Sequence, residues 1–231
     1  MRLLIVGHGR MGRLVEQLAP GYGFELAGVL EVGDNAGGAG VTRERCRAVD
    51  VAVDFSAPEA TLATAPKLAA LGVSLVIGTT GWQAHEAELR EAVLAAGVGA
   101  VVAPNFSLAA NLLEALVCSA GRLFASAEAY GAFIHEAHHK AKKDAPSGTA
   151  LMLRRALERG GFPRAVDVSS TRAGFIPGTH TVGFDGPAET LTLTHTVRDR
   201  ATLAHGALEA ARWVIGRRGW FTMQDVLGIE V

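Results

Sequence analysis

Residues 3–12 read Leu-Leu-Ile-Val-Gly-His-Gly-Arg-Met-Gly, and this stretch decides how the first half of the chain is interpreted. A short apolar run that ends in glycine is typical of a buried strand. Apolar side chains then recur at helical spacing over residues 11–18. A strand, a glycine turn and a helix in this order predict the first unit of a parallel sheet.

The same alternation of strand and helix continues to about residue 103. Helices are predicted from Pro58, a residue that suits the first helical position, to about Leu71, and again over Trp82–Ala95. Four more apolar stretches are predicted as strands: Phe24–Leu30, Val49–Phe55, Ser74–Ile77 and Gly99–Ala103. Because these strands show no polar alternation, both faces of the sheet should be covered. The sequence therefore predicts an α/β fold with a Rossmann-like, doubly wound parallel sheet.

The second half has a different pattern. Three helices are predicted there: Leu108–Phe124, Gly148–Arg159 and Ala201–Ile215. The stretch Tyr130–Ala137 is predicted as a strand, and three Thr- and Val-rich segments with a period of two follow it: Val166–Arg172, Thr179–Phe184 and Glu189–Val197. These segments indicate an antiparallel or mixed sheet, and hence a second domain of α+β type.

Composition narrows the class of protein. The chain has 231 residues, 49% of them hydrophobic, with 22 basic and 23 acidic side chains, so a disordered chain or a basic nucleic-acid binder is not expected. The two cysteines cannot form a dense disulfide framework, which favours a reducing compartment. The charge-free stretch 92–113 is broken by glycine, proline and asparagine, so no membrane span is expected. With no secretory signal evident, we expect a cytoplasmic protein without nucleic-acid or membrane partners.

The glycine turn has the spacing of a dinucleotide-binding loop. Glycines at these positions let backbone N–H groups approach a pyrophosphate at the helix N-terminus, although a turn used only for packing is the alternative. An acid about twenty residues further on, Glu31, is suited to the ribose diol. Val32 follows it rather than an arginine, which favours NADH over NADPH, while Arg10 offers charge near the phosphates. The loop residues are Gly7, His8, Gly9, Arg10, Met11 and Gly12.

A second candidate site lies in residues 135–149. Only four lysines occur against eighteen arginines, yet Lys140, Lys142 and Lys143 fall together, just after His135, His138 and His139. Lysine supplies a compact charge, and histidine exchanges protons near neutral pH. The stretch Asp144-Ala145-Pro146-Ser147-Gly148-Thr149 then opens a helix whose amides can bind an anion. The cluster predicts a site for a small carboxylate.

Three other interpretations of this cluster remain open: a solvated basic loop, a metal site and a nucleic-acid patch. A metal site would use the three histidines, but on a strand His135 and His139 face away from His138. A nucleic-acid patch would need interleaved aromatic residues. We therefore expect no metal, and we assign the first domain (1–107 and 200–231) to the dinucleotide and the second (108–199) to substrate binding and oligomerisation.

The stretch from Glu136 to Ala150 resembles the E-A-H-H-x-x-K-x-D-A-P-S-G-T-A signature of the 4-hydroxy-tetrahydrodipicolinate reductase family, which acts in the diaminopimelate route to lysine. Further similar stretches are spread over the whole chain, at residues 9–12, 53–56, 77–81, 103–107, 172–174 and 178–182. The chain differs from many members in a glycine loop shortened by one residue, in a trimmed segment between residues 34 and 46, and in Val32, Ala57 and Thr179.

The resemblance implies reduction of 4-hydroxy-tetrahydrodipicolinate to tetrahydrodipicolinate by NADH or NADPH, in a homotetramer assembled through the second domain's sheet. It places the cofactor on the glycine loop and Glu31, with the nicotinamide beside Gly78, Thr79, Thr80, Ala103, Pro104, Asn105 and Phe106. It makes His138 and Lys142 the proton donors. It assigns the substrate dicarboxylate to His139, Gly148 and Thr149, helped by Ser147. The alternatives are a dehydrogenase of another small amino or keto acid and a non-catalytic nicotinamide sensor.

Overall fold

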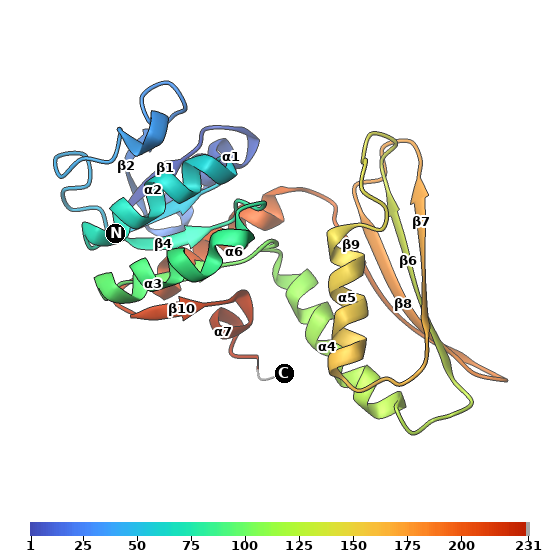
Figure 1. Cartoon of the computed structure of the whole chain (residues 1–231). Coiled ribbons are helices and arrows are strands. Elements are labelled where there is room, and N and C mark those ends of the chain that lie inside the picture. Colours follow the sequence, from blue (N-terminus) through green and yellow to red (C-terminus); the bar gives the residue numbers. More distant parts are fainter. Residues whose placement is uncertain (230–231) are drawn as a thin grey trace. The chain divides into compact units, whose positions relative to one another are not determined.

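A computed structural model describes residues 1–229, so the last two residues of the predicted segment 200–231 lie outside the described residues. The chain divides into two compact units (Figure 1). Unit 1 contains Met1–Ser107 and residues 201–229, and unit 2 contains Leu108–Arg200.

Unit 1 is built on a six-stranded sheet with the order β10-β5-β4-β3-β1-β2. Every pair of neighbouring strands in it is parallel. The strands are β1 (Arg2–Val6), β2 (Glu25–Leu30), β3 (Val51–Asp54), β4 (Ser74–Ile77), β5 (Gly99–Val102) and β10 (Gly219–Phe221). The predicted doubly wound parallel sheet is thereby confirmed.

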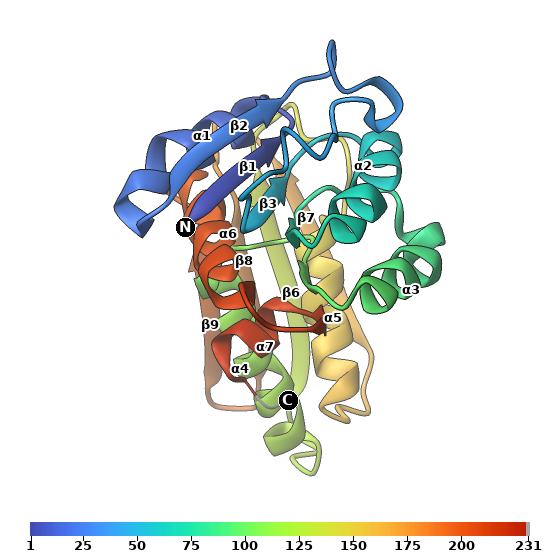
Figure 2. The same ribbon diagram turned by 90° about the vertical axis from the view of Figure 1, so that its left-hand side faces the viewer.

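Helices cover both faces of this sheet because alternate strand residues point to opposite sides. Leu3 and Ile5 of β1 enter the core under one set of helices, and Leu4 and Val6 enter the core under the other. Figure 2 shows helices on both sides of the sheet. The first set is α1 (Arg10–Leu18), α6 (Ala201–Val214) and α7 (Met223–Leu227), and the second is α2 (Pro58–Ala70) and α3 (Glu86–Ala96).

Local chemistry explains where the structure differs from the sequence prediction in unit 1. The helix predicted from Trp82 begins only at Glu86, after a short 3₁₀ turn over Gln83–His85. Trp82 is buried, and its indole N–H donates to the carbonyl of Thr79 at 2.7 Å, which holds residue 82 in the preceding loop. The elements β10 and α7 were not predicted, because three and five residues are too short to show a periodicity.

Unit 2 holds a four-stranded mixed sheet with the order β7-β6-β8-β9. Its strands are β6 (Gly131–His138), β7 (Val166–Arg172), β8 (Thr179–Asp185) and β9 (Thr190–Thr196). Strand β7 is parallel to β6, whereas β8 and β9 are antiparallel to their neighbours. Helices α4 (Leu108–Phe124) and α5 (Gly148–Arg159) lie against one face and form a separate core with it (Figure 1). The predicted second α+β sheet is thus confirmed.

Among the described residues, no helix combines the length and the apolar character that crossing a membrane requires.

Candidate active site

The polar residues of unit 2 gather on the face of the sheet that also builds its core. Ile134, Glu136 and His138 alternate along β6, so all three point to the side of α4 and α5. The strand register places His180 of β8 beside Glu136, and Arg172 of β7 beside His138. The apolar core therefore continues into an ionisable cluster toward the end of β6.

Glu136 is the anion at the centre of this cluster, and its side chain is completely buried. Arg172 binds the carboxylate with both terminal nitrogens, at 2.6 and 2.8 Å. The backbone N–H of Ser147 donates to the same carboxylate at 3.3 Å. Burial by itself raises the pKa of Glu136, but hydrogen bonds from Arg172, Ser170 and His138 together outweigh it and the pKa falls to about 2. Glu136 is therefore ionised throughout the physiological range.

His138 takes its orientation from Glu136. Its Nδ1 lies 2.5 Å from a carboxylate oxygen of Glu136, so Nδ1 carries a proton and Nε2 is the reactive nitrogen. Burial lowers the pKa of His138, and the charge of Glu136 acts in the opposite direction. A Cβ at Gly178 would lie 3.1 Å from Nε2, so the absence of a side chain there leaves space beside the reactive nitrogen. His138 has the tautomer and the surroundings of a general acid–base group.

His180 packs its ring edge-on against that of His138, with 5.0 Å between the centroids. Its Nε2 lies 3.0 Å from the hydroxyl of Ser147, whereas its buried Nδ1 has no hydrogen-bond partner among the described residues. Burial, with a smaller contribution from the neighbouring His138, lowers the pKa of His180 to about 4. His180 is therefore neutral near pH 7.

The loop after β6 supplies the cations. Lys142 forms an ion pair with Asp144 at 2.7 Å, and hydrogen bonding to this lysine lowers the pKa of Asp144. The positive charge of Lys142 also contributes to the lowered pKa of His138, which places the two groups within electrostatic reach of each other. His139 is half-buried, and its carbonyl accepts from the N–H of Lys142 at 3.1 Å.

Helix α5 begins at the other side of this loop. Ser147 is its N-cap, and its hydroxyl accepts from the N–H of Ala150. This hydroxyl also contacts His180, so Ser147 is connected to the site through that histidine. Gly148 is exposed, and a Cβ there would meet nothing within 4 Å. The first turn of α5, with the half-buried Thr149, therefore presents open backbone donors to an anion.

A metal centre would use other residues than the three histidines that were weighed from the sequence. Ligand atoms of Glu136, His138 and His180 lie within 4.8 Å of one another. Arg172 already binds both oxygens of the Glu136 carboxylate, and a cation would have to compete with that guanidinium. His135, the first of the three histidines weighed from the sequence, instead contacts Ser169 at 2.9 Å on the opposite face of the sheet.

In unit 1 the glycine loop lies where β1 meets α1. Gly7 has a φ of +88°, which only glycine adopts without strain, and a Cβ at Gly12 would lie 2.0 Å from the carbonyl oxygen of Gly7. By contrast, a Cβ at Gly9 would meet nothing within 4 Å. The loop is thus closed toward the protein and open above the helix N-terminus, and these residues fit a dinucleotide pyrophosphate. Arg10 is exposed and Met11 half-buried at the start of α1.

The other predicted cofactor residues also follow the carboxyl ends of parallel strands, which lie along one edge of the sheet. Glu31 follows β2, and its side chain is 62% exposed. Residues 78–80 follow β4, with Thr80 exposed but the hydroxyl of Thr79 donating to Asp54 at 3.0 Å inside the protein. Burial raises the pKa of Asp54, one oxygen of which has no partner among the described residues.

After β5, Ala103 and Phe106 are buried, Asn105 is half-buried and Pro104 is exposed.

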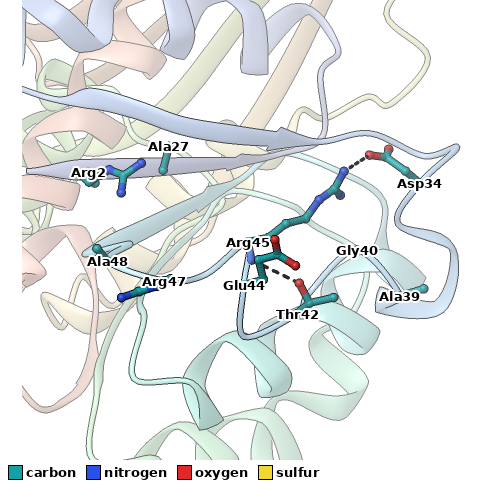
Figure 3. Close-up of a pocket in the computed structure, with 10 residues that line it drawn as sticks. All are labelled: Arg2, Ala27, Asp34, Ala39, Gly40, Thr42, Glu44, Arg45, Arg47 and Ala48. Atoms are coloured by element: carbon teal, nitrogen blue, oxygen red, sulfur yellow. Dashed lines mark hydrogen bonds and ion pairs between the residues drawn. The ribbon is translucent and has the colours of Figure 1, made fainter.

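A cavity of about 790 Å³ lies elsewhere in unit 1, between the strands β1 and β2 and residues 34–48 (Figure 3). Arg2, Arg45 and Arg47 line it together with Asp34 and Glu44. None of the predicted site residues lines this cavity.

Three residues of the cluster were not assigned a role from the sequence: Glu136, Arg172 and His180. A signal for the first was present, because Glu136 precedes His138 by two positions, and two such residues share a face once the predicted strand is extended by one residue to His138. Arg172 and His180 had no such local signal, since their proximity depends on the pairing of three strands.

A Rossmann-like unit followed by a second sheet that carries a buried acid–base cluster defines the class of two-domain oxidoreductases. Comparison with known proteins specifies the family. The model of the dihydrodipicolinate reductase N-terminus matches residues 1–106, and that of the C-terminus matches residues 109–227. The chain belongs to the dihydrodipicolinate reductase family.

Individual relatives agree with this assignment. The 4-hydroxy-tetrahydrodipicolinate reductase of Laribacter hongkongensis is 39% identical, over 100% of this chain and 99% of the relative. That of Methanoregula boonei is 35% identical, over 96% and 95% of the two chains. A dipicolinate-bound dihydrodipicolinate reductase from Paenisporosarcina sp. TG-14 has a TM-score of 0.80 at 21% identity, over 97% of this chain and 98% of that chain, which shows a shared fold.

Proposed function

We propose that this chain reduces 4-hydroxy-tetrahydrodipicolinate to tetrahydrodipicolinate with NADH or NADPH, and that NADH is preferred. The observation that carries the proposal is the His138–Glu136–Arg172 arrangement, which leaves one imidazole nitrogen available beside cationic groups and an open helix N-terminus. Membership of the reductase family supports the same reaction.

Substrate binding follows from charge and geometry. The substrate is a dicarboxylate, and we assign its carboxylates to His139 and to the first turn of α5, at Gly148 and Thr149. Ser147 supports this turn as its N-cap. Cationic groups at the carboxylates stabilise the negative charge that develops on the ring during reduction.

Proton transfer is assigned to His138 and Lys142. Loss of the 4-hydroxyl as water leaves a conjugated ring, which accepts a hydride at one carbon and a proton at the adjacent carbon. When bound, the reduced nicotinamide supplies the hydride. His138 delivers the proton from Nε2 while Glu136 stabilises the imidazolium form through Nδ1. Lys142 is the second proton donor, and it supplies a proton to the site after His138 has given up its own.

Unit 1 would hold the cofactor. We assign the pyrophosphate to the loop Gly7–Gly12, the adenosine ribose to Glu31, and the nicotinamide to the segments 78–80 and 103–106. The preference for NADH rests on Val32, which is 88% exposed directly after Glu31 where a cation would be needed for a 2′-phosphate.

The proposal is tested by following the oxidation of NADH and NADPH by absorbance. The substrate is generated in situ from pyruvate and aspartate semialdehyde by its synthase. Turnover is expected with wild-type protein. His138→Ala should lower kcat about 10²- to 10⁴-fold and leave dinucleotide affinity unchanged. His135→Ala is the matched control, because it lies on the same strand and faces the other side. Dinucleotide binding without turnover in the wild type would instead favour a nicotinamide sensor or a dehydrogenase of another acid.

A further inference from the structure

His8 occupies the variable position between the first two glycines of the loop, and both of its ring nitrogens face carboxylates. Nε2 lies 2.7 Å from Glu16 of α1, and Nδ1 lies 3.0 Å from Glu31 after β2. A neutral imidazole has one N–H and one lone pair, so only the protonated ring can donate to both acids. The geometry therefore favours an imidazolium at this position.

The surroundings support the same protonation state. Hydrogen bonding to Glu16 raises the pKa of His8, and Glu31 contributes in the same direction. These two carboxylates are the titratable groups that face the ring, while the exposed side chains of Arg10 and Arg13 begin on the same helix. Protonated His8 reduces the summed charge of the three groups from −2 to −1.

One of these three groups, Glu31, is the residue to which the adenosine ribose is assigned. His8 contacts only Oε1 of Glu31, which leaves Oε2 for a ribose hydroxyl. A 2′-phosphate in place of the 2′-hydroxyl would meet the charge of Glu31, and the adjacent Val32 offers no cation. His8 is the cation that the structure places against Glu31.

We propose that His8 sets the cofactor preference: its imidazolium partly neutralises Glu31 and so weakens the repulsion of a ribose 2′-phosphate, so that NADPH competes with NADH only while His8 is protonated. The inference rests on the proposed function, because it takes Glu31 as the ribose ligand. NADH needs no cation at this position, so its affinity should depend far less on His8.

The test measures the dissociation constants of NADH and NADPH by nucleotide fluorescence at a series of pH values from 7 upward, where the 2′-phosphate is largely ionised. In the wild type the ratio Kd(NADPH)/Kd(NADH) should rise by about threefold to tenfold as His8 loses its proton. In His8→Gln the ratio should be high at every pH. The pKa of His8 itself is followed by NMR of the ring protons in the dinucleotide-free protein.

A second variant separates this role from a structural one. Glu16→Gln leaves His8 and Glu31 in place but removes one acid, so the midpoint of the ratio and the NMR midpoint should shift together to lower pH. Glu25→Gln, an exposed acid on β2, is the matched control and should shift neither. A ratio that is independent of pH in the wild type, or a midpoint that Glu16→Gln leaves unchanged, overturns the inference. If the wild type binds neither dinucleotide, the proposed cofactor is overturned as well, whereas binding and turnover with an invariant ratio overturn only the role of His8.

Discussion

At the scale of single residues, the stability of unit 2 depends on pH, because its core contains the buried ionisable residues Glu136 and His180. Glu136 is held ionised by Arg172, and His180 is held neutral by burial. The pKa of His180 is lower in the folded than in the unfolded protein, so the unfolded protein binds the extra proton as the pH falls. The contribution of His180 to the free energy of unfolding is complete above about pH 6.5 and is lost between pH 6.5 and about 4.

The first prediction concerns this loss of stability. Between pH 6.5 and 4 the free energy of unfolding of the wild type should fall by about 1.4 kcal/mol per pH unit from His180 alone. His180→Gln, which keeps a nitrogen near Ser147, should remove this contribution and flatten the profile. Urea unfolding at a series of pH values measures it. His85→Gln is the control, since His85 is exposed on unit 1; an unflattened profile in His180→Gln would contradict the assignment.

Glu136 contributes over a lower pH range. Its folded-state pKa of about 2 lies below the unfolded value, so its contribution is complete above about pH 4.5 and is lost as the pH falls toward 2.

The second prediction is that Glu136→Gln lowers kcat about 10- to 100-fold, because the imidazolium form of His138 loses its stabilising charge. The NMR pKa of His138 should fall in parallel, whereas damage to packing alone would not move it. Glu128→Gln, an exposed acid in the same unit, should retain wild-type kcat and the wild-type pKa of His138. An unchanged His138 pKa in Glu136→Gln would exclude the positioning role.

At the scale of elements, the turn between β1 and α1 contains two glycines that differ in the space around them. Gly12 lies in the first turn of α1 against the backbone of Gly7, whereas Gly9 faces open space. The same turn thus contains one position that serves packing and one that is available to a ligand.

The third prediction compares these two positions. Gly12→Ala should destabilise the protein by about 1–3 kcal/mol, because its Cβ would lie 2.0 Å from the carbonyl oxygen of Gly7. Gly9→Ala should keep wild-type stability, since its φ of −73° suits alanine, but should weaken dinucleotide binding. Thermal unfolding and fluorescence titration measure the two effects. Equal loss of stability in both variants would mean that Gly9 also serves packing.

Much of the element pattern follows from the sequence. Strands β3, β4 and β5 were predicted because their residues are almost entirely apolar and bounded by turns or helices. The start of α3 was misplaced because Trp82 is held by a tertiary hydrogen bond, which a periodicity does not reveal. The chemistry of the sequence singled out a histidine–lysine cluster that includes His138, and the family resemblance implied the role of this residue. The pairing of Glu136 with Arg172 joins residues 36 positions apart and depends on strand register.

At the scale of the whole molecule, the open face of the unit 2 sheet is the feature relevant to assembly. Thr181 and Thr194 meet there at 3.0 Å, and Thr179 and Thr196 meet at 3.1 Å, on the side opposite to α4 and α5. We propose that this face joins four copies of the chain, as the family resemblance implies.

The fourth prediction tests this assembly. Light scattering after size exclusion should give four times the chain mass of 24.1 kDa for the wild type. Thr194→Arg should lower the mass, because it places a charge in the proposed interface. Arg198→Glu, an exposed change beyond the end of β9, serves as the control. A wild type with the mass of one chain would refute the tetramer.

The continuity between the core of unit 2 and its acid–base cluster also bears on attempts to redesign this protein. Glu136 and His138 share one strand face with Ile134, so randomising them would sacrifice folding together with activity. Lys140, Ala141 and Lys143 are exposed and lie outside that face. A mutant library aimed at accepting other cyclic acids should therefore diversify this loop and Thr149, and leave the strand intact.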